Sequence, residues 1–254
     1  TNFNLDTRIS DGEFKTDVKS EEALAQTLGV SGSLPSDGTP EERAAVLKNS
    51  IANPGSHIVG GSRLFSAESS PYAIEVICDN QPLPIALENK LTHCDIPLAS
   101  TYAIRLYNFS DYDAAVRVSI DGISLFAFSE LRHVDGPKKG EPLYDSYVVP
   151  SKRFIQIAGC HRTNDRGDSF LVTDIAKGAA ITLKREIDKS RMGTISAQFC
   201  AAWPIGEDPP PDEPPAKKGT PRATGFGPPV SQTVTEVKRN IGILRSTVSL
   251  RYDK

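Results

Sequence analysis

The stretch from Ala114 to Glu130 constrains the fold most, because it has the pattern of a strand, a two-residue turn and a second strand. Asp121-Gly122 lies between two runs of β-branched and aromatic residues, and Asp-Gly is favoured in type I′ turns, where both central residues need positive φ. A two-residue loop predicts three facing pairs on one apolar face: Ile120–Ile123, Val118–Leu125 and Val116–Ala127. The sequence therefore predicts a β-hairpin that places this face in the core.

Short strands are predicted along most of the chain after residue 57. Residues 102–128 are expected to form a three-stranded meander that ends in this hairpin. The other predicted strands are Tyr72–Cys78, Pro82–Leu87, Tyr147–Val149, Arg153–Ala158, Ser169–Thr173, Ala180–Leu183, Thr194–Trp203, Thr233–Val237 and Ile243–Tyr252. At least eight short strands without a βαβ rhythm predict a mainly β fold, namely an antiparallel β-sandwich of jelly-roll or immunoglobulin-like type.

Two short helices are predicted before the strands. Ser20–Leu28 starts with a capping serine, and Thr39–Asn53 starts with Thr39, Pro40 and a capping-box Glu42. We therefore expect residues 1–56 to form an N-terminal arm with two helices, and residues 57–254 to form the β-sandwich domain. The Pro-rich excursion 204–229 is expected to be extended, either as a mobile linker or pinned against its own domain or a neighbour.

Composition excludes several function classes. Charged residues make up 24% of the 254-residue chain and the net charge is −3, so no nucleic-acid partner is expected. No run of about 18 apolar residues occurs, so membrane insertion is not expected either. Thr1 fits cleavage of a signal peptide, removal of an initiator Met, or trimming. We expect an extracellular or cell-surface protein, with a cytoplasmic location as the alternative.

The even number of cysteines leaves three interpretations open. The residues are Cys78, Cys94, Cys160 and Cys200. They are either buried small apolar side chains, or they form one or two disulfides in one of three pairings. His93-Cys94 and Cys160-His161 could together hold zinc, but they lack the usual ligand spacing.

Arg166-Gly167-Asp168 matches an adhesion motif that functions when it is exposed in a turn, although these are also common turn residues. Gly167-Asp168-Ser169 is similar to the opening block of GDSL hydrolases. That family places its base in a late Asp-x-x-His, whereas all four histidines here precede Ser169. The hydrolase assignment therefore fails, and no catalytic residue is predicted.

Two further patterns are weak candidates for a site. Asn108-Phe109-Ser110 has the form of a glycosylation sequon. Four loop aspartates could serve calcium, although aspartates are also common in turns: Asp111, Asp113, Asp165 and Asp168. The aspartates lack EF-hand or repeat-type spacing, so no metal or cofactor is predicted.

Four segments carry a family resemblance: Tyr102–Asn108, Val118–Glu130, Thr224–Gly227 and Ser249–Tyr252. The chain resembles uncharacterised secreted bacterial β-sandwich proteins of planctomycete type over residues 70–254. The resemblance implies an extracellular β-protein and supplies neither an activity nor a functional residue.

Three functions follow as hypotheses. The first is a non-enzymatic structural or interaction protein, a self-associating subunit of an extracellular filament, coat or surface layer, whose partner is itself or another surface protein. The second is a carbohydrate- or peptide-binding module, for which five aromatic residues are available: Tyr107, Tyr112, Tyr144, Tyr147 and Phe226. The third is a metal-dependent jelly-roll enzyme, which the absence of a His-x-His pair disfavours.

Overall fold

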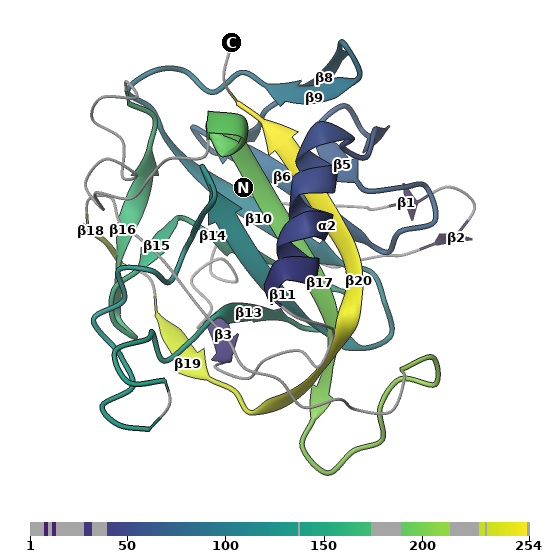
Figure 1. Cartoon of the computed structure of the whole chain (residues 1–254). Coiled ribbons are helices and arrows are strands. Elements are labelled where there is room, and N and C mark those ends of the chain that lie inside the picture. Colours follow the sequence, from purple (N-terminus) through teal and green to yellow (C-terminus); the bar gives the residue numbers. More distant parts are fainter. Residues whose placement is uncertain are drawn as a thin grey trace.

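The computed structural model describes residues 8–9, 12–13, 28–31, 40–136, 138–173, 189–213, 229–231 and 233–252. The fold is mainly β, with antiparallel-rich sheets (Figure 1). Within this described part there is one α-helix, α2 (Pro40–Ala52), rather than the two expected, and one 3-10 helix, η2 (Lys189–Arg191). The predicted helix 20–28 lies outside the described residues except for Leu28, which begins a strand.

The first large sheet, called the β10 sheet, is organised around β10, which pairs antiparallel with β6, β14 and β16. In the described part of the chain it has nine strands: β4 (His57–Val59), β5 (Arg63–Phe65), β6 (Tyr72–Cys78), β7 (Gln81–Pro82), β10 (Thr101–Asn108), β14 (Arg153–Ile157), β15 (Gly159–His161), β16 (Arg166–Leu171) and β18 (Pro229–Ser231).

The second large sheet, called the β17 sheet, is organised around β17, which lies between β11 and β20. Its described strands are β3 (Leu28–Ser31), β8 (Ile85–Glu88), β9 (Leu91–Cys94), β11 (Asp113–Ile120), β12 (Ile123–Ser124), β13 (Ser146–Val149), β17 (Thr194–Pro204), β19 (Val234–Glu236) and β20 (Arg239–Arg251). A separate pair consists of β1 (Arg8–Ile9) and β2 (Gly12–Glu13).

One apolar core joins the two large sheets. Ile74 and Ile104 of the β10 sheet belong to the same buried cluster as Val116 and Phe199 of the β17 sheet. The rings of Tyr72 and Phe199 stack across the two sheets with centroids 4.9 Å apart. Alternate residues of β6 and β10 therefore face this core, while the residues between them face away from it.

The predicted hairpin is confirmed at its turn and at Val118–Leu125, where the Leu125 N–H donates to the Val118 carbonyl at 3.1 Å, and it is wrong beyond that pair. Asp121 and Gly122 have φ of 55° and 75°, as a type I′ turn requires, and Ile120 pairs with Ile123. The second strand, β12, ends at Ser124. Val116 therefore does not face Ala127; it pairs with Tyr147 of β13 and Phe199 of β17.

The predicted meander is also wrong, because β10 and β11 belong to different sheets. The connection at residues 109–112 carries the chain from one sheet to the other. Asn108 holds this corner: its buried side-chain amide donates to the carbonyls of Tyr112 (2.7 Å) and Val149 (3.0 Å). Local alternation indicates which face a side chain occupies, but it does not indicate which sheet a strand joins.

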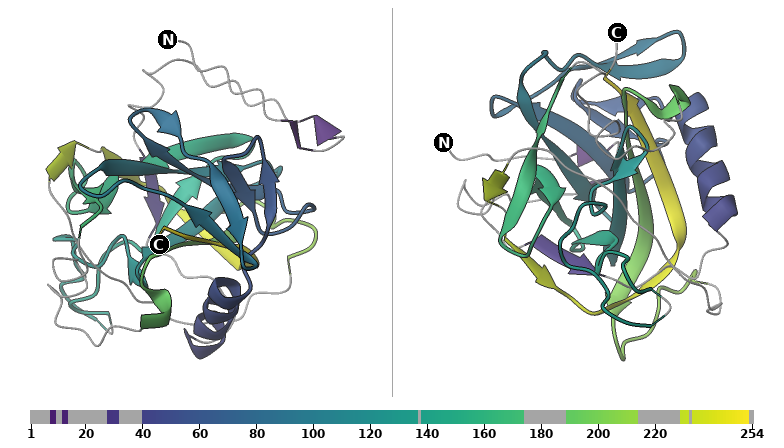
Figure 2. Two further views of the ribbon diagram at one scale, coloured as in Figure 1. Left: turned by 90° about the horizontal axis from the view of Figure 1, so that it is seen from above. Right: turned by 60° about the vertical axis from the view of Figure 1, so that its left-hand side comes forward.

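Two described parts of residues 1–56, β3 and α2, contact the rest of the chain. β3 pairs with β13, and α2 packs on the outer side of β17 and β20 (Figure 2). The contact of α2 is partly polar, because Ser50 bonds to Ser249 at 2.8 Å. The domain boundary at residue 56 stays a prediction.

The first part of the Pro-rich excursion is pinned against β20. Arg245 forms ion pairs with both Asp212 and Glu213, and the backbone N–H of Ile243 donates to Glu213. The side chain of Glu213 lies over Gly242, where an added Cβ would overlap the carboxylate. The described part of the excursion, residues 205–213, is therefore held against its own domain, as one of the two alternatives predicted. Residues 214–228 lie outside the described residues.

Candidate functional site

Two rows of side chains cross the β10 sheet on the face opposite the core. The strand register places His57, Phe65, Ala73, Tyr107 and Phe154 in one row, over β4, β5, β6, β10 and β14. The register aligns Glu75 with Arg105 and Arg105 with Gln156 in the second row. Extending the β5–β6 register by one residue places Arg63 beside Glu75 in the same row.

The first row is a nearly continuous series of ring contacts. His57 meets Phe65 edge-on with centroids 5.6 Å apart, and Tyr107 lies 5.1 Å from Phe154. Phe109 joins the two halves, because its ring stacks on Phe65 at 5.9 Å and on Tyr107 at 5.8 Å. Such contacts stabilise neighbouring strands beyond the area that they bury.

The second row is charged and buried. Glu75 is 1% exposed and Arg105 is 2% exposed. The Glu75 carboxylate accepts hydrogen bonds from Ser62 Oγ (2.6 Å), Tyr107 Oη (2.6 Å) and Arg105 Nη1 (3.4 Å). Burial, followed by the neighbouring Glu75 charge, raises the pKa of Tyr107 well above its usual value, so the phenol stays protonated and donates.

Arg63 is the uncompensated charge of the site. It is 7% exposed, and its guanidinium lies over the Tyr107 ring at 4.4 Å. Among the described residues, no hydrogen bond or ion pair to its side chain is found, and its Nε is a buried donor without an acceptor. The rows thus combine two guanidinium groups with one carboxylate, which makes the site positively charged.

A second buried polar group lies at the end of β15. His161 Nδ1 is 3.1 Å from Ser129 Oγ, and the ring contacts Phe126 and Tyr144 at 5.3 and 5.5 Å. Both His161 and Ser129 are about 1% exposed. A serine and histidine in contact could suggest a nucleophile and its base, but a substrate cannot reach a pair buried this deeply.

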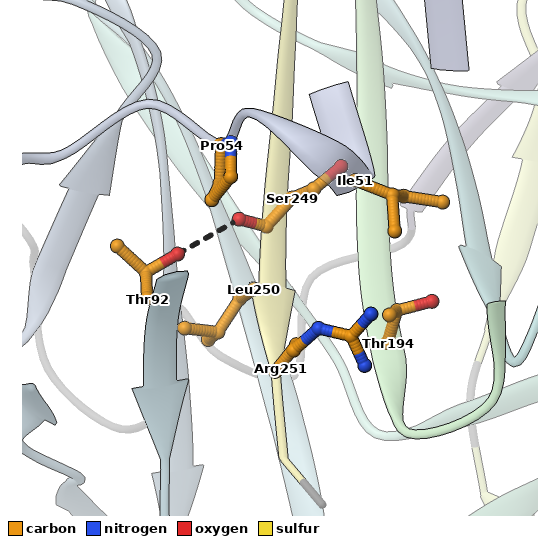
Figure 3. A pocket seen from close by; sticks show the side chains of 7 residues that line it. All are labelled: Ile51, Pro54, Thr92, Thr194, Ser249, Leu250 and Arg251. Carbon is orange, nitrogen blue, oxygen red and sulfur yellow. Dashed lines mark hydrogen bonds between the residues drawn. The ribbon is translucent and has the colours of Figure 1, made fainter. Parts of the chain in front are cut away.

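A pocket lies between α2, β9, β17 and β20 (Figure 3). Seven residues line it: Ile51, Pro54, Thr92, Thr194, Ser249, Leu250 and Arg251. Thr92 Oγ1 donates to the backbone carbonyl of Ser249 at 3.1 Å, and Ser249 Oγ is 2.9 Å from Ser196 Oγ. The pocket has no room for a ligand, so these hydroxyls have a structural role beneath α2.

The predicted turn motif is in a strand. Arg166, Gly167 and Asp168 begin β16 rather than forming an exposed turn. Asp168 is buried and ion-paired with Arg162, while Arg166 pairs with Glu130 at 2.6 Å. The two charged groups of the motif are therefore engaged within the chain.

All four cysteines are free thiols in this structure. Cys78, Cys94 and Cys200 are buried, and Cys160 is half-buried. The part of the chain that the structure describes contains no group of three or more His, Cys, Asp or Glu side chains that could hold a metal ion.

The other candidate residues are buried, lie outside the described residues, or form ion pairs or hydrogen bonds within the chain, apart from the partly exposed Tyr112. Asn108 of the sequon is fully buried. Asp111 pairs with Lys152, Asp113 pairs with Arg239, and Asp165 accepts a hydrogen bond from Thr163. The aromatic residues named for a binding module do not form an open platform: Tyr107, Tyr144 and Tyr147 are buried, Tyr112 is 36% exposed, and Phe226 lies outside the described residues.

The sequence contained a signal for the charged row that spacing motifs do not capture. Tyr-Ala-Ile opens both Tyr72–Cys78 and the Tyr102 strand, and the fourth residue is Glu75 in one and Arg105 in the other. Opposite charges at matching places in two otherwise apolar strands indicate a cross-strand pair. The guanidinium of Arg63 had no comparable signal, because its position over Tyr107 depends on the tertiary register.

No known protein family, curated protein or solved structure matches this chain. In the described ranges, no helix is long and apolar enough to cross a membrane.

Proposed function

We propose that this chain is a non-enzymatic interaction protein that self-associates through the free edge of β8, as a subunit of an extracellular assembly. The two large sheets are proposed to pack as a β-sandwich, which their shared core supports. Another surface protein is the alternative partner. The observation that carries the proposal is that β8 is an edge strand and carries the exposed side chain of Leu87.

This hairpin lies at the upper end of the molecule in Figure 1 and forms one end of the β17 sheet. In the described part of the chain β8 pairs only with β9, through an Asn89-Lys90 turn with φ of 50° and 68°. Leu87 is 54% exposed. An edge strand with an exposed apolar side chain is a template for strand addition.

The register shows which backbone groups are available on this edge. In a two-residue hairpin, Glu88 and Leu91 form a hydrogen-bonded pair, so Leu87 directs its N–H and C=O away from β9. The backbone N–H of Ile85 is also directed away from β9, and it donates to the carbonyl of Gly61 at 2.8 Å. A second copy related by a two-fold axis would therefore pair at Leu87, burying both leucine side chains.

Light scattering over a wide range of concentrations, with electron microscopy of the same sample, tests this proposal. The wild-type protein is expected to form dimers or larger assemblies, and Leu87→Lys is expected to shift them towards monomer. Val134→Lys is the matched control, because Val134 is also exposed (81%) but lies in a loop outside β8. A wild-type protein that stays monomeric at all concentrations would remove the proposal.

A further inference from the structure

We propose that the guanidinium of Arg63, held against the face of Tyr107, binds an oxyanion that comes from outside the chain: a carboxylate, sulfate or phosphate group. This site is on the β10 sheet and does not depend on association through β8.

The charges of the two rows do not balance. Glu75 is the only carboxylate in the two rows, and it already accepts from Ser62, Tyr107 and Arg105. Arg63 lies in the same row but is directed over the Tyr107 ring instead. A buried charge without a hydrogen-bonded counter-ion is costly, so an anion that compensates it should bind favourably.

The guanidinium of Arg63 is held in place before any ligand binds. The Tyr107 ring supports the guanidinium on one side and is itself fixed by its bond to Glu75 and by the parallel ring of Phe109, with 4° between the planes. A planar guanidinium that is held in place presents paired N–H donors, which match two oxygens of an oxyanion. Little conformational entropy would then be lost when the ligand binds.

Arg63 follows an exposed glycine turn. Gly60 and Gly61 come directly before Ser62 and Arg63, and a Cβ added to either glycine would meet no atom within 4 Å. The space beside these two glycines is open. Of the Arg63 guanidinium nitrogens, only Nε is fully buried without a partner, so the exposed 7% of the residue leaves the two terminal nitrogens for an anion to approach. His57, on the neighbouring strand, has a buried Nε2 without a partner in the described chain, a second polar atom on this face that a ligand could satisfy.

The experiment measures thermal unfolding in sulfate, phosphate, acetate and chloride at constant ionic strength. For the wild type, at least one oxyanion should raise Tm above the chloride value in a saturable manner. Arg63→Gln should lose this saturable increase. Arg166→Gln is the control, because Arg166 is half-exposed and pairs with Glu130, and it should keep the increase.

The anions also distinguish the source of the ligand. A rise in Tm with acetate indicates a carboxylate ligand, as in an acidic peptide or sugar acid. A rise in Tm with sulfate and phosphate alone indicates a tetrahedral oxyanion. Either result supports the site. Equal increases in the wild type and Arg63→Gln, or no oxyanion effect beyond chloride, would overturn it.

A direct readout covers the case in which Arg63→Gln is too unstable to compare. The ¹H–¹⁵N signal of the Arg63 Nε, assigned by its loss in Arg63→Lys, should shift on titration of the wild type with the effective anion. An unmoved Arg63 signal while other surface arginine signals shift would place the binding elsewhere.

Discussion

His161 should make the stability of this protein depend on pH in the mildly acidic range. Burial lowers its pKa from 6.5 to about 4, and the nearby Asn164 side chain only partly opposes this effect. The hydrogen bonds explain why protonation is unfavourable. Ser129 Oγ donates to the carbonyl of Leu131 (3.0 Å), so His161 Nδ1 donates to Ser129, and a second proton must go to Nε2, which is buried without a partner among the described residues.

The sign follows from the two pKa values. The unfolded chain takes up the proton near pH 6.5, whereas the folded chain resists it until about pH 4. The stabilising effect of a neutral His161 is thus complete above pH 6.5 and is lost as the pH falls to about 4. Each pKa unit corresponds to about 1.4 kcal/mol, so the total loss is about 3 kcal/mol.

Urea unfolding across this pH range checks the prediction. The free energy of unfolding of the wild type should fall by about 3 kcal/mol more than that of His161→Gln, which cannot take up the proton. His133→Gln is the matched control at a half-buried histidine and should follow the wild type closely. If the wild-type and His161→Gln curves run parallel from neutral pH to below pH 4, the reasoning fails.

Three further predictions concern the packing of the chain. Gly242→Ala should destabilise the protein by about 1–3 kcal/mol in denaturant unfolding, because the new methyl group overlaps the Glu213 carboxylate; in a Glu213→Ala background the same change should cost much less. An aromatic disulfide reagent should label the thiols far faster after unfolding than before, since burial raises the pKa of Cys94 to about 12; rapid native labelling would contradict this. Asn108→Ala should cost on the order of 3 kcal/mol by leaving buried carbonyls unpaired, and a glycosylating host should add no glycan at Asn108, which mass spectrometry would show.

Local chemistry in the sequence was sufficient to predict single elements. Alternation located Tyr72–Cys78 with the bounds that the structure has, and Asp121-Gly122 predicted the turn that joins β11 and β12. The capping residues placed α2 within one residue at each end. In each case the deciding interactions join residues close together in the sequence, so the pattern records them directly.

The assignment of strands to sheets depends on contacts that the pattern does not record. Residues 109–112 have the composition of a tight turn, yet the chain uses this turn to change sheets, because the Asn108 amide ties the corner to β13 at Val149. The same limit applies to the hairpin: Val116 has Tyr147 and Phe199 beside it, and these partners are far from it in the sequence.

The candidate site shows a second limit, which concerns burial. Alternation in Tyr72–Cys78 and in the Tyr102 strand predicts one apolar face and one face in water. The structure buries both faces of β6, including Glu75. Three donors, among them Arg105 on the neighbouring strand, offset the free-energy cost of burying the Glu75 carboxylate. Arg63 is also buried, but no carboxylate of the described chain forms an ion pair with it. A strand that alternates in sequence but is buried on both faces requires a partner for each charge, and for Arg63 the described chain supplies only an aromatic ring. This imbalance of charge is the physical reason to expect an anion at this position.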